Sequence, residues 1–304
     1  MTSRPPRARR TILAVPGSSE RFIAKSTGLR VDEVFLDLED GVAVGAKKDA
    51  RGQIVEALTT RTWEAPTVAV RVNDWTTPWT YGDVLEVIGG AGSRVDAVIL
   101  PKVSTPGHVE ALDLLLTQVE REHGLAVGRI GIEAIIEDAR GLAAVQAIAA
   151  ASPRLESLTM GPGDMMASLG MPGLGVGALV EGYPGDPLHH VFAQILVAAR
   201  AHGLQAIDGP FVGIHDVDGF RAAARRVAAL GYDGKWVLHP AQVEAGMEVF
   251  TPSEEAIERA RAMVDAADRA AEEGIGAVML GDEMVDEAGV KLARTLLARL
   301  PSHT

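Results

Sequence analysis

The sequence contains no cysteine among its 304 residues. This absence excludes disulfide bonds, cysteine nucleophiles and metal sites with thiolate ligands. Positive charge is also scarce, because 29 Lys and Arg residues face 41 Asp and Glu residues, for a net charge of −12. Such a balance argues against a surface that binds nucleic acid or an anionic membrane. Any anionic ligand must therefore be met by a local group of basic side chains.

Long apolar runs are missing as well. None approaches the roughly 18 residues of a membrane span, and the apolar stretch at residues 11–15 is too short for a signal sequence. We therefore expect a cytoplasmic protein. The basic start of the chain, from Arg4 to Arg9, is interpreted as a solvated tail. Hydrophobic residues make up 47% of the chain, which is ample for a large core.

Short apolar stretches alternate with amphipathic helical stretches along most of the chain. Helices are predicted near residues 46–58, 81–88, 108–120, 139–150, 189–202 and 216–230. Strands are predicted at residues 12–15, 34–38, 67–72, 95–100, 130–136, 155–160, 205–208 and 235–238. Because parallel strands need helical crossovers, eight strand–helix alternations favour an α/β fold with a closed TIM (β/α)8 barrel. An open dinucleotide-binding sheet is disfavoured, since the first turn reads Pro16-Gly17-Ser18-Ser19 and lacks the G-x-G-x-x-G pattern.

The chain continues well beyond the eighth predicted strand. We expect a barrel domain at residues 10–248 and a C-terminal helical extension at residues 249–304. Within the extension, the pattern predicts a long helix to about residue 273, a short hairpin and a last helix at residues 288–300. More chain is present than barrel closure requires, so the extension is interpreted as a lid or an oligomerisation arm. A Gly-rich loop at residues 170–186 has no periodicity, and loops of this length are usually functional or mobile.

Three acids follow the second predicted strand, which is apolar from Val34 to Leu38. Asp37, Glu39 and Asp40 gather at its C-terminal end, where crowded carboxylates repel one another and lose hydration. A cation, an arginine or a proton held at a raised pKa must compensate them if they are buried. The alternative is a strand end whose acids point into water.

Polar residues also follow the other strands, and in a TIM barrel the active site lies at the carboxyl ends of the strands. Glu137 and Asp164 follow adjacent strands, so their carboxylates can converge on one ion. Two carboxylates without a neighbouring His or Cys suit Mg²⁺ better than zinc. The planar guanidinium of Arg71 suits a carboxylate or enolate oxygen. One face would then hold Glu39, Asp40, Arg71, Asn73, Lys102, Glu137, Asp164, Asp208 and His239, although strand-end salt bridges explain any one of them. The imidazole of His239 is expected to bond a backbone carbonyl.

Several segments together resemble a known family. The chain is similar to the citrate lyase β-subunit-like superfamily of carbon–carbon lyases (the HpcH/HpaI aldolase/citrate lyase family) in the segments LAVPGSSERF, FLDLEDGV, VRVN, LPKV, IEAIIEDARG, GPGD, IDGPF and GKWVLHPAQV. Within this superfamily, AAASPRLESL, GYPGDPLHH and VFTPSEEAIERA resemble the malyl-CoA/β-methylmalyl-CoA lyase branch. The resemblance extends from about Arg10 to the C-terminus.

This resemblance implies a TIM barrel, a divalent metal (usually Mg²⁺, with Mn²⁺ as the alternative), an acyl-CoA and a small 2-oxo acid. Glu137 and Asp164 match the metal ligands of the family. Glu39 and Asp40 match acids that hold metal-bound waters, and Arg71 matches the arginine that contacts substrate oxygens.

The resemblance also implies contacts outside the metal site. Arg21 and Lys25 match positions near the phosphates of CoA, which agrees with the need for local basic charge. Asp286 matches a catalytic acid that the C-terminal lid of a neighbouring subunit delivers. A homo-oligomer, a trimer or a hexamer, is therefore expected.

The implied activity is reversible Claisen-type cleavage of malyl-CoA or β-methylmalyl-CoA to acetyl-CoA or propionyl-CoA and glyoxylate. A citramalyl-CoA lyase and a malyl-CoA thioesterase are alternatives, because residues 166–181 are shorter and richer in glycine than is typical of malyl-CoA lyases. A CoA-independent 2-oxo acid aldolase is a further alternative, which Arg21 and Lys25 argue against. The last is a partner-dependent citrate lyase β-like subunit, which the complete set of catalytic residues argues against.

Overall fold

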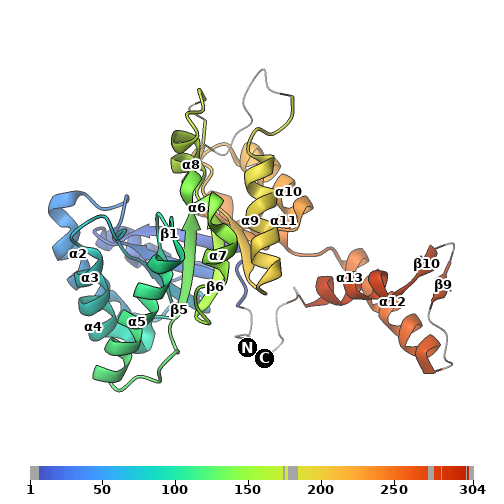
Figure 1. The fold of residues 1–304 in the computed structure, drawn as a ribbon, viewed down its shortest axis with the longest axis horizontal. Helices are drawn as coiled ribbons and strands as arrows, with labels where there is room; N and C mark the ends of the chain where they lie inside the picture. Colours follow the sequence, from blue (N-terminus) through green and yellow to red (C-terminus); the bar gives the residue numbers. More distant parts are fainter. Residues whose placement is uncertain are drawn as a thin grey trace. The chain divides into compact units, whose positions relative to one another are not determined.

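Eight parallel strands close into a barrel in the computed structural model, which describes residues 7–173, 175–176, 184–272, 277–281, 283–298 and 300 (Figure 1). The strands are β1 (Thr11–Pro16), β2 (Glu33–Asp37), β3 (Thr67–Arg71), β4 (Ala97–Leu100), β5 (Gly131–Ile136), β6 (Leu155–Met160), β7 (Gln205–Asp208) and β8 (Gly234–Val237). Each strand pairs in parallel with the next, and β8 pairs with β1, so the barrel has no free edge. The predicted TIM barrel is confirmed.

The helices that connect the strands cover the outside of the barrel (Figure 1). They are α1 (Glu20–Ser26), α2 (Lys47–Thr60), α3 (Thr80–Asp83), α4 (Gly89–Ala91), α5 (Pro106–Glu122), α6 (Ala139–Ala143), α7 (Val145–Ala149), α8 (Pro162–Ser168), α9 (His189–Ala201), α10 (Val217–Leu230) and α11 (Val243–Phe250). Short 3-10 turns are η1 (Val44–Ala46), η3 (Gly92–Arg94) and η4 (Pro240–Gln242), and η2 (Val84–Ile88) is a π-helical segment. The helix predicted at residues 139–150 is divided at Ala144, and α8 is a helix that the sequence pattern did not predict.

A hydrophobic layer fills the middle of the barrel. It consists of Ile12, Phe35, Ala69, Ala97, Ile99, Ile135, Ile207 and Trp236, all buried. The rings of Phe35 and Trp236 are in contact, with 4.6 Å between their centroids. Because side chains alternate along a strand, Glu33 and Asp37 of β2 point inward on either side of Phe35. The layer therefore separates a polar amino-terminal end from the carboxyl end of the strands.

The amino-terminal end of the barrel is closed by an arginine, so the predicted solvated tail is wrong where the structure describes it. Arg9 is only 1% exposed. Its guanidinium contacts the carboxylates of Glu33 at 2.9 Å, Glu133 at 2.9 Å and Glu156 at 2.6 Å. Arg7 also pairs with Glu156, at 3.2 Å. Inward-pointing acids at the strand starts need a buried cation, and the segment before β1 supplies it. The residues before Arg7 lie outside the described part.

The chain divides into two compact units, Met1–Met247 with the barrel and Glu248–Thr304. The second unit contains α12 (Glu254–Glu272), an antiparallel hairpin of β9 (Val278–Leu280) and β10 (Glu283–Val285), and α13 (Glu287–Leu297). The hydroxyl of Ser253 accepts a hydrogen bond from the Ala256 N–H at 3.2 Å and caps α12. An ion pair of 2.8 Å between Arg294 and Asp268 joins α13 to α12. This order of helix, hairpin and helix agrees with the predicted one.

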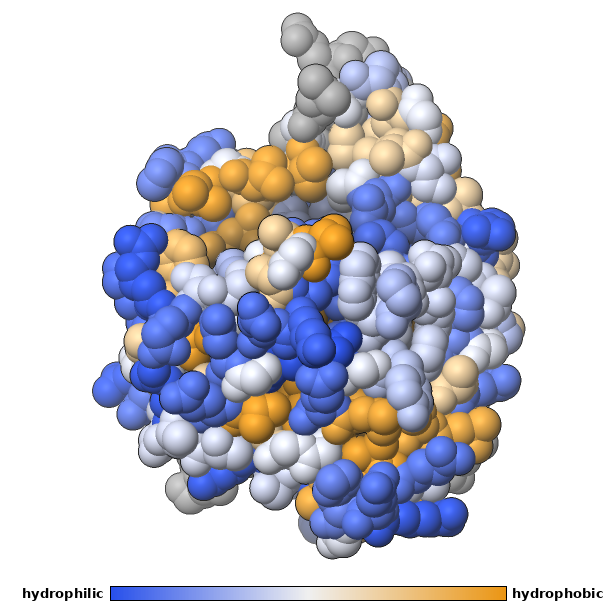
Figure 2. All heavy atoms as spheres, turned by 90° about the vertical axis from the view of Figure 1, so that its left-hand side faces the viewer, coloured by the Kyte–Doolittle hydropathy of each residue, from blue (hydrophilic) through white to orange (hydrophobic). Residues whose placement is uncertain are grey.

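Figure 2 shows the face of the barrel unit that carries α2, α3 and α4. Apolar side chains gather in its upper and lower parts, and hydrophilic side chains lie between them. Large exposed apolar residues are spread over different elements, for example Val44 in η1, Tyr81 in α3 and Leu114 in α5. Isolated residues of this kind are common on protein surfaces. No helix in the described ranges is long and apolar enough to cross a membrane.

Candidate active site

An arginine at the end of β3 lies over the hydrophobic layer and is clamped by acids from β2. The Arg71 guanidinium binds Asp37 in a bidentate manner, with Nε–Oδ1 and Nη2–Oδ2 distances of 2.7 and 2.8 Å, and its Nη1 lies 2.9 Å from Glu39. Its Cζ lies 5.7 Å from the centre of the Phe35 ring and 5.5 Å from that of Trp236. A guanidinium has five N–H groups, so these contacts leave part of the fork available to a ligand oxygen.

The charges of this group stabilise one another. Burial alone lowers the pKa of Arg71, but the carboxylates of Asp37 and Glu39 raise it above its usual value, so the guanidinium stays charged. Burial raises the pKa of Asp37, but Arg71 and the N–H groups of Glu39 and Gly41 outweigh it and hold this pKa below its usual value. The predicted strand-end acids are therefore compensated by an arginine.

Lys102, just after β4, connects two acids of the site. It has a φ of +52°, which places a non-glycine residue in the left-handed region. In this conformation its N–H donates to Glu137 Oε1 at 2.7 Å, while its Nζ binds Glu39 and lies 3.7 Å from Asp40. Burial lowers the pKa of Lys102, but its bond to Glu39 raises it above its usual value. Backbone strain of this kind is concentrated at functional sites.

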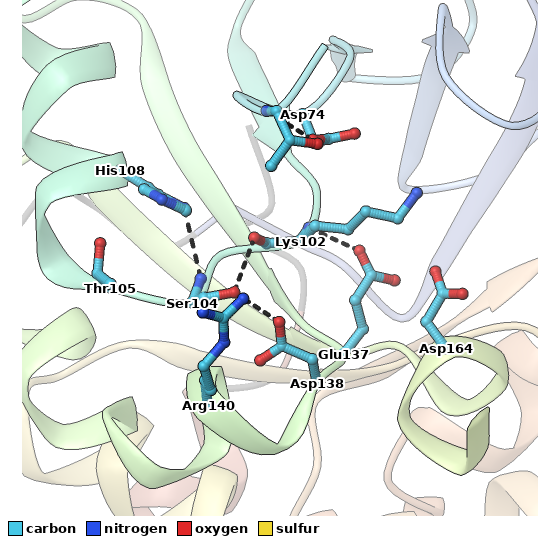
Figure 3. Close-up of a pocket in the computed structure, with 10 residues that line it drawn as sticks. Asp74, Lys102, Ser104, Thr105, His108, Glu137, Asp138, Arg140 and Asp164 are labelled. Carbon is cyan, nitrogen blue, oxygen red and sulfur yellow. Dashed lines mark hydrogen bonds between the residues drawn. The ribbon is translucent and has the colours of Figure 1, made fainter. Parts of the chain in front are cut away.

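Glu137 and Asp164 form the acidic end of the site. Glu137 directly follows β5 and is 7% exposed, whereas Asp164 lies in the first turn of α8 and is exposed. Figure 3 shows both side chains pointing the same way into one cavity. Burial, together with the charges of Asp164 and Glu39, raises the pKa of Glu137 to about 8. This carboxylate pair lacks a sufficient counter-charge, so its chemistry fits a divalent cation. No three His, Cys, Asp or Glu side chains form a metal site in the ranges that the structure describes.

The cavity beside these acids has a volume of about 380 Å³. It is lined by Asp74, Thr76, Lys102, Ser104, Thr105, His108, Glu137, Asp138, Arg140 and Asp164 (Figure 3). Glu137 and Asp164 lie on one side of this view, and His108 and Arg140 lie on the other. The cavity is therefore acidic at one end and carries unused donors at the other.

Two strand-end residues expected in the site have other contacts. Asn73 donates to Asp83 Oδ2 through its backbone N–H and its side-chain Nδ2, at 2.9 and 2.7 Å. Asp208 points outward and binds Lys235, which is buried between the barrel and Phe220 of α10. The expectation that one face holds all nine residues is therefore wrong for Asp208, which points to the helix layer, and for Asn73, which supports a loop.

His239 accepts a hydrogen bond from the backbone, whereas it was expected to donate one. Its Nδ1 accepts a hydrogen bond from the Ala241 N–H at 3.1 Å and caps η4. It therefore does not bond a backbone carbonyl through this atom.

The residues expected to contact CoA or to act from the extension lie on separate elements. Arg21 and Lys25 are exposed on α1, which follows β1, and neither forms an ion pair with another described residue. The first turn of such a helix lies near the carboxyl ends of the strands. Asp286 is exposed in the second unit, where its side chain accepts a bond of 2.9 Å from the Gly289 N–H and caps α13. The Gly-rich loop at residues 170–186 falls partly outside the described residues, at 174 and 177–183.

Known proteins resemble this chain over most of its length. The family model for HpcH/HpaI aldolase/citrate lyase matches residues 10–240. The chain belongs to the HpcH/HpaI aldolase/citrate lyase family. An L-malyl-CoA/β-methylmalyl-CoA lyase of Cereibacter sphaeroides is 41% identical, over 96% of this chain and 95% of that protein. A (3S)-malyl-CoA thioesterase of the same species is 34% identical, over 95% of this chain and 94% of that protein.

A solved structure with bound ligands is also similar to this chain. The CitE protein of Mycobacterium tuberculosis, in complex with magnesium, acetoacetate and coenzyme A, is 30% identical, with a TM-score of 0.74. The similarity covers 95% of this chain and 97% of that chain. The resemblance inferred from the sequence motifs is therefore confirmed at the level of the family.

Sequence reasoning missed two supporting roles in the site. Asp37 was recognised only as one of the crowded acids, yet it orients Arg71 through two bonds. Lys47 of α2 is buried, and its Nζ binds the carbonyls of Leu38 and Glu39, each at 2.9 Å. The spacing of Asp37 two residues before Glu39 was the available signal, since both then lie on one side of the chain.

Proposed function

We propose that this protein is a magnesium-dependent lyase that cleaves the carbon–carbon bond of a 3-hydroxyacyl-CoA such as malyl-CoA or β-methylmalyl-CoA. The products are acetyl-CoA or propionyl-CoA and glyoxylate. The observation that carries this proposal is a charged Arg71, held by Asp37, at the same barrel end as the under-compensated carboxylates of Glu137 and Asp164. Its likeness to L-malyl-CoA/β-methylmalyl-CoA lyase over 96% of the chain supports the choice of substrate.

Glu137 and Asp164 would hold the metal, and Glu39 and Asp40 would orient the waters around it. A bound Mg²⁺ would supply a Lewis acid for the oxygens of the 2-oxo acid. Arg71 donates hydrogen bonds to the thioester oxygen, where negative charge develops as the enolate forms. Its position is fixed in advance by Asp37 and Glu39, so little reorganisation is needed during the reaction.

Asp286 would move the proton at the carbon next to the thioester. We propose that residues 249–304 act as a lid, and that this acid reaches the barrel of a neighbouring copy in a homotrimer or homohexamer. Its exposure in the second unit leaves the carboxylate accessible for such a role. Arg21 and Lys25 would bind the phosphates of CoA, since both are exposed cations without an ion-pair partner among the described residues.

The test is to incubate the purified protein with Mg²⁺, acetyl-CoA and glyoxylate, with and without EDTA, and to follow thioesters by mass spectrometry. We expect a malyl-CoA product that disappears with EDTA. The control variant Glu137→Gln should form no product, while Glu110→Gln on the outer face of α5 should remain active. An EDTA-insensitive product would contradict the role of the metal.

A thioesterase is the second candidate function, because a (3S)-malyl-CoA thioesterase is 34% identical to the chain. In that case malyl-CoA would yield free CoA and malate, and no acetyl-CoA or glyoxylate would form. The same mass-spectrometric assay, started from malyl-CoA, separates the two functions.

A further inference from the structure

We propose that the buried ion pair of Asp208 and Lys235, on the outer side of β7 and β8, positions the residues that would bind the metal. The pair acts through the loop that follows β7 and through the start of α8, which carries Asp164. The inference rests on the proposed function, since it takes Glu137 and Asp164 as the metal ligands. It goes further because Asp208 and Lys235 do not line the cavity into which these ligands point.

The two charged residues lie side by side on neighbouring strands. Asp208 and Lys235 are register partners in β7 and β8, and the Lys235 Nζ lies 2.5 Å from the Asp208 carboxylate. Lys235 is 0% exposed and Asp208 is 3% exposed. Apolar residues of similar volume are often as stabilising as a buried ion pair, or more so. Stability alone therefore does not explain why two charges are buried at this place.

The ion pair holds the first residue of the loop that follows β7. The Lys235 Nζ also donates a hydrogen bond to the carbonyl oxygen of Gly209, at 2.7 Å. Burial raises the pKa of Asp208 above its usual value, and both Lys235 and the Gly209 N–H oppose this rise. Both backbone polar groups of Gly209 therefore interact with the pair, which fixes the path of the chain at this residue.

Gly209 lies directly against the start of α8. A Cβ added at this position would meet the Pro162 Cδ and the Met160 carbonyl oxygen, both at 2.5 Å. Pro162 is the first residue of α8, and its ring fixes φ at the point where the helix begins. The backbone of Gly209 is therefore the surface on which the first residue of α8 packs.

The position of Pro162 affects both proposed metal ligands. Asp164 follows it by two residues, in the first turn of α8. Gly161 precedes it and packs against Glu137, where an added Cβ would meet the Glu137 Cβ at 2.5 Å. Figure 3 shows the two carboxylates directed into the same cavity. A shift of Pro162 would therefore change how these carboxylates lie relative to each other.

Metal binding is sensitive to such a shift. Mg²⁺ requires a nearly ideal octahedral arrangement of its oxygen ligands, so small displacements of a carboxylate weaken its binding. Replacing residues that orient metal ligands typically lowers metal affinity by about 10-fold to 100-fold. We therefore expect Asp208 and Lys235 to act as positioning residues, whose loss is seen in the affinity for Mg²⁺ more than in the stability of the fold.

The experiment compares stability with Mg²⁺ affinity in a variant that keeps the net charge of the protein. Asp208→Leu/Lys235→Met removes one charge of each sign together with the donor to Gly209, and apolar replacements of this kind often preserve stability. We expect a Tm close to that of the unmodified protein and Mg²⁺ binding that is about tenfold weaker. Tm is measured by scanning calorimetry, and affinity by titration calorimetry of the full-length protein with Mg²⁺ alone.

Two further variants separate positioning from stability. The matched control Arg154→Met breaks another buried ion pair, in which Arg154 lies 2.6 Å from Glu120. Arg154 precedes β6 at the amino-terminal end of the strands, so this variant should have a lower Tm and an unchanged Mg²⁺ affinity. Gly209→Ala disturbs the contact with Pro162 directly and should weaken Mg²⁺ binding as the double variant does.

Equal Mg²⁺ affinities of the unmodified protein and the double variant overturn the inference. An equal loss of affinity in Arg154→Met overturns it as well, because Mg²⁺ binding then only follows stability. If the double variant does not fold, Gly209→Ala provides the test, and an unchanged Mg²⁺ affinity in that variant refutes the positioning role. If the unmodified protein does not bind Mg²⁺, the proposed metal site fails together with the inference, whereas unchanged binding in the variants refutes the inference alone.

Discussion

Glu137 depends on two close backbone contacts for its position. The Lys102 N–H donates to its Oε1 at 2.7 Å. On the other side lies Gly161, where an added Cβ would meet the Cβ and Oε2 of Glu137, both at 2.5 Å. The Gly-Pro-Gly-Asp motif thus has a steric function in addition to carrying Asp164. A side chain at its first position cannot coexist with the observed carboxylate.

We therefore expect Gly161→Ala to displace Glu137 and weaken Mg²⁺ binding. Overpacking of this kind costs about 1–3 kcal/mol, which corresponds to a loss in affinity of about 5-fold to 150-fold. The affinity is measured by titration calorimetry with Mg²⁺. The matched control is Gly163→Ala in the same motif, where the new Cβ would find Val176 at 3.8 Å, an ordinary contact. Equal affinities of the two variants would refute the steric role of Gly161.

Strand β2 illustrates what a single element contributes. Its three inward residues have three different tasks: Glu33 closes the amino-terminal end, Phe35 belongs to the hydrophobic layer, and Asp37 clamps the arginine of the site. The period of two along a strand places all three on one side. The stability of this strand is therefore linked to charge at both of its ends.

Glu33 makes the stability of the barrel depend on pH. Burial, and then the charge of Glu133, raise its pKa well above the usual value, although Arg9 opposes this. A carboxyl whose pKa is raised by folding holds a proton that the unfolded chain releases. Its contribution to stability is fully present below the pKa of the unfolded chain and is lost as the pH rises toward the pKa of the folded protein.

We predict that Glu33→Gln becomes more stable relative to the unmodified protein as the pH rises from 5 to 8. Glutamine resembles the protonated acid and has no proton to lose. Within this window the difference grows by up to about 1.4 kcal/mol per pH unit, and it is measured as the difference in Tm between the two proteins. The exposed Glu64→Gln variant should show no such trend. A difference that stays constant with pH would mean that Glu33 is ionised beside Arg9.

At the scale of the molecule, the proposed catalytic groups are divided between two compact units. Glu137 lies in the unit Met1–Met247, and Asp286 lies in the unit Glu248–Thr304. If the acid acts on a neighbouring copy, a complete site needs a barrel from one chain and an extension from another. Closed cyclic assemblies allow every copy to give and receive such an element.

This arrangement predicts complementation between two inactive variants. Glu137→Gln and Asp286→Asn should each lose most of kcat, whereas their co-expressed mixture should recover activity in about a quarter of the sites if subunits mix at random. The recovered lyase activity is measured on purified mixed oligomers. The absence of recovery, in oligomers shown by mass spectrometry to contain both chains, would mean that Asp286 serves its own barrel.

Much of the fold follows from local pattern. The eight strands lie close to their predicted positions, because short apolar stretches between amphipathic helices can be recognised without knowledge of the contacts. The convergence of Glu39, Arg71 and Glu137 also followed from the chain, since the carboxyl ends of parallel strands meet at one end of a barrel. Helix α8 was missed, because Pro162 and Gly163 near its start resemble a turn.

The sequence by itself therefore determined the barrel, the family and the group of residues from which the site is drawn. Only the tertiary structure decided which of them face inward. Asp37 and Asp208 both end strands, yet the first points into the barrel toward Arg71 and the second outward toward Lys235. Strands covered on both faces are apolar throughout, so their sequence does not distinguish inside from outside. The buried position of Arg9 and the positive φ of Lys102 likewise arise from partners far along the chain, which no local pattern records.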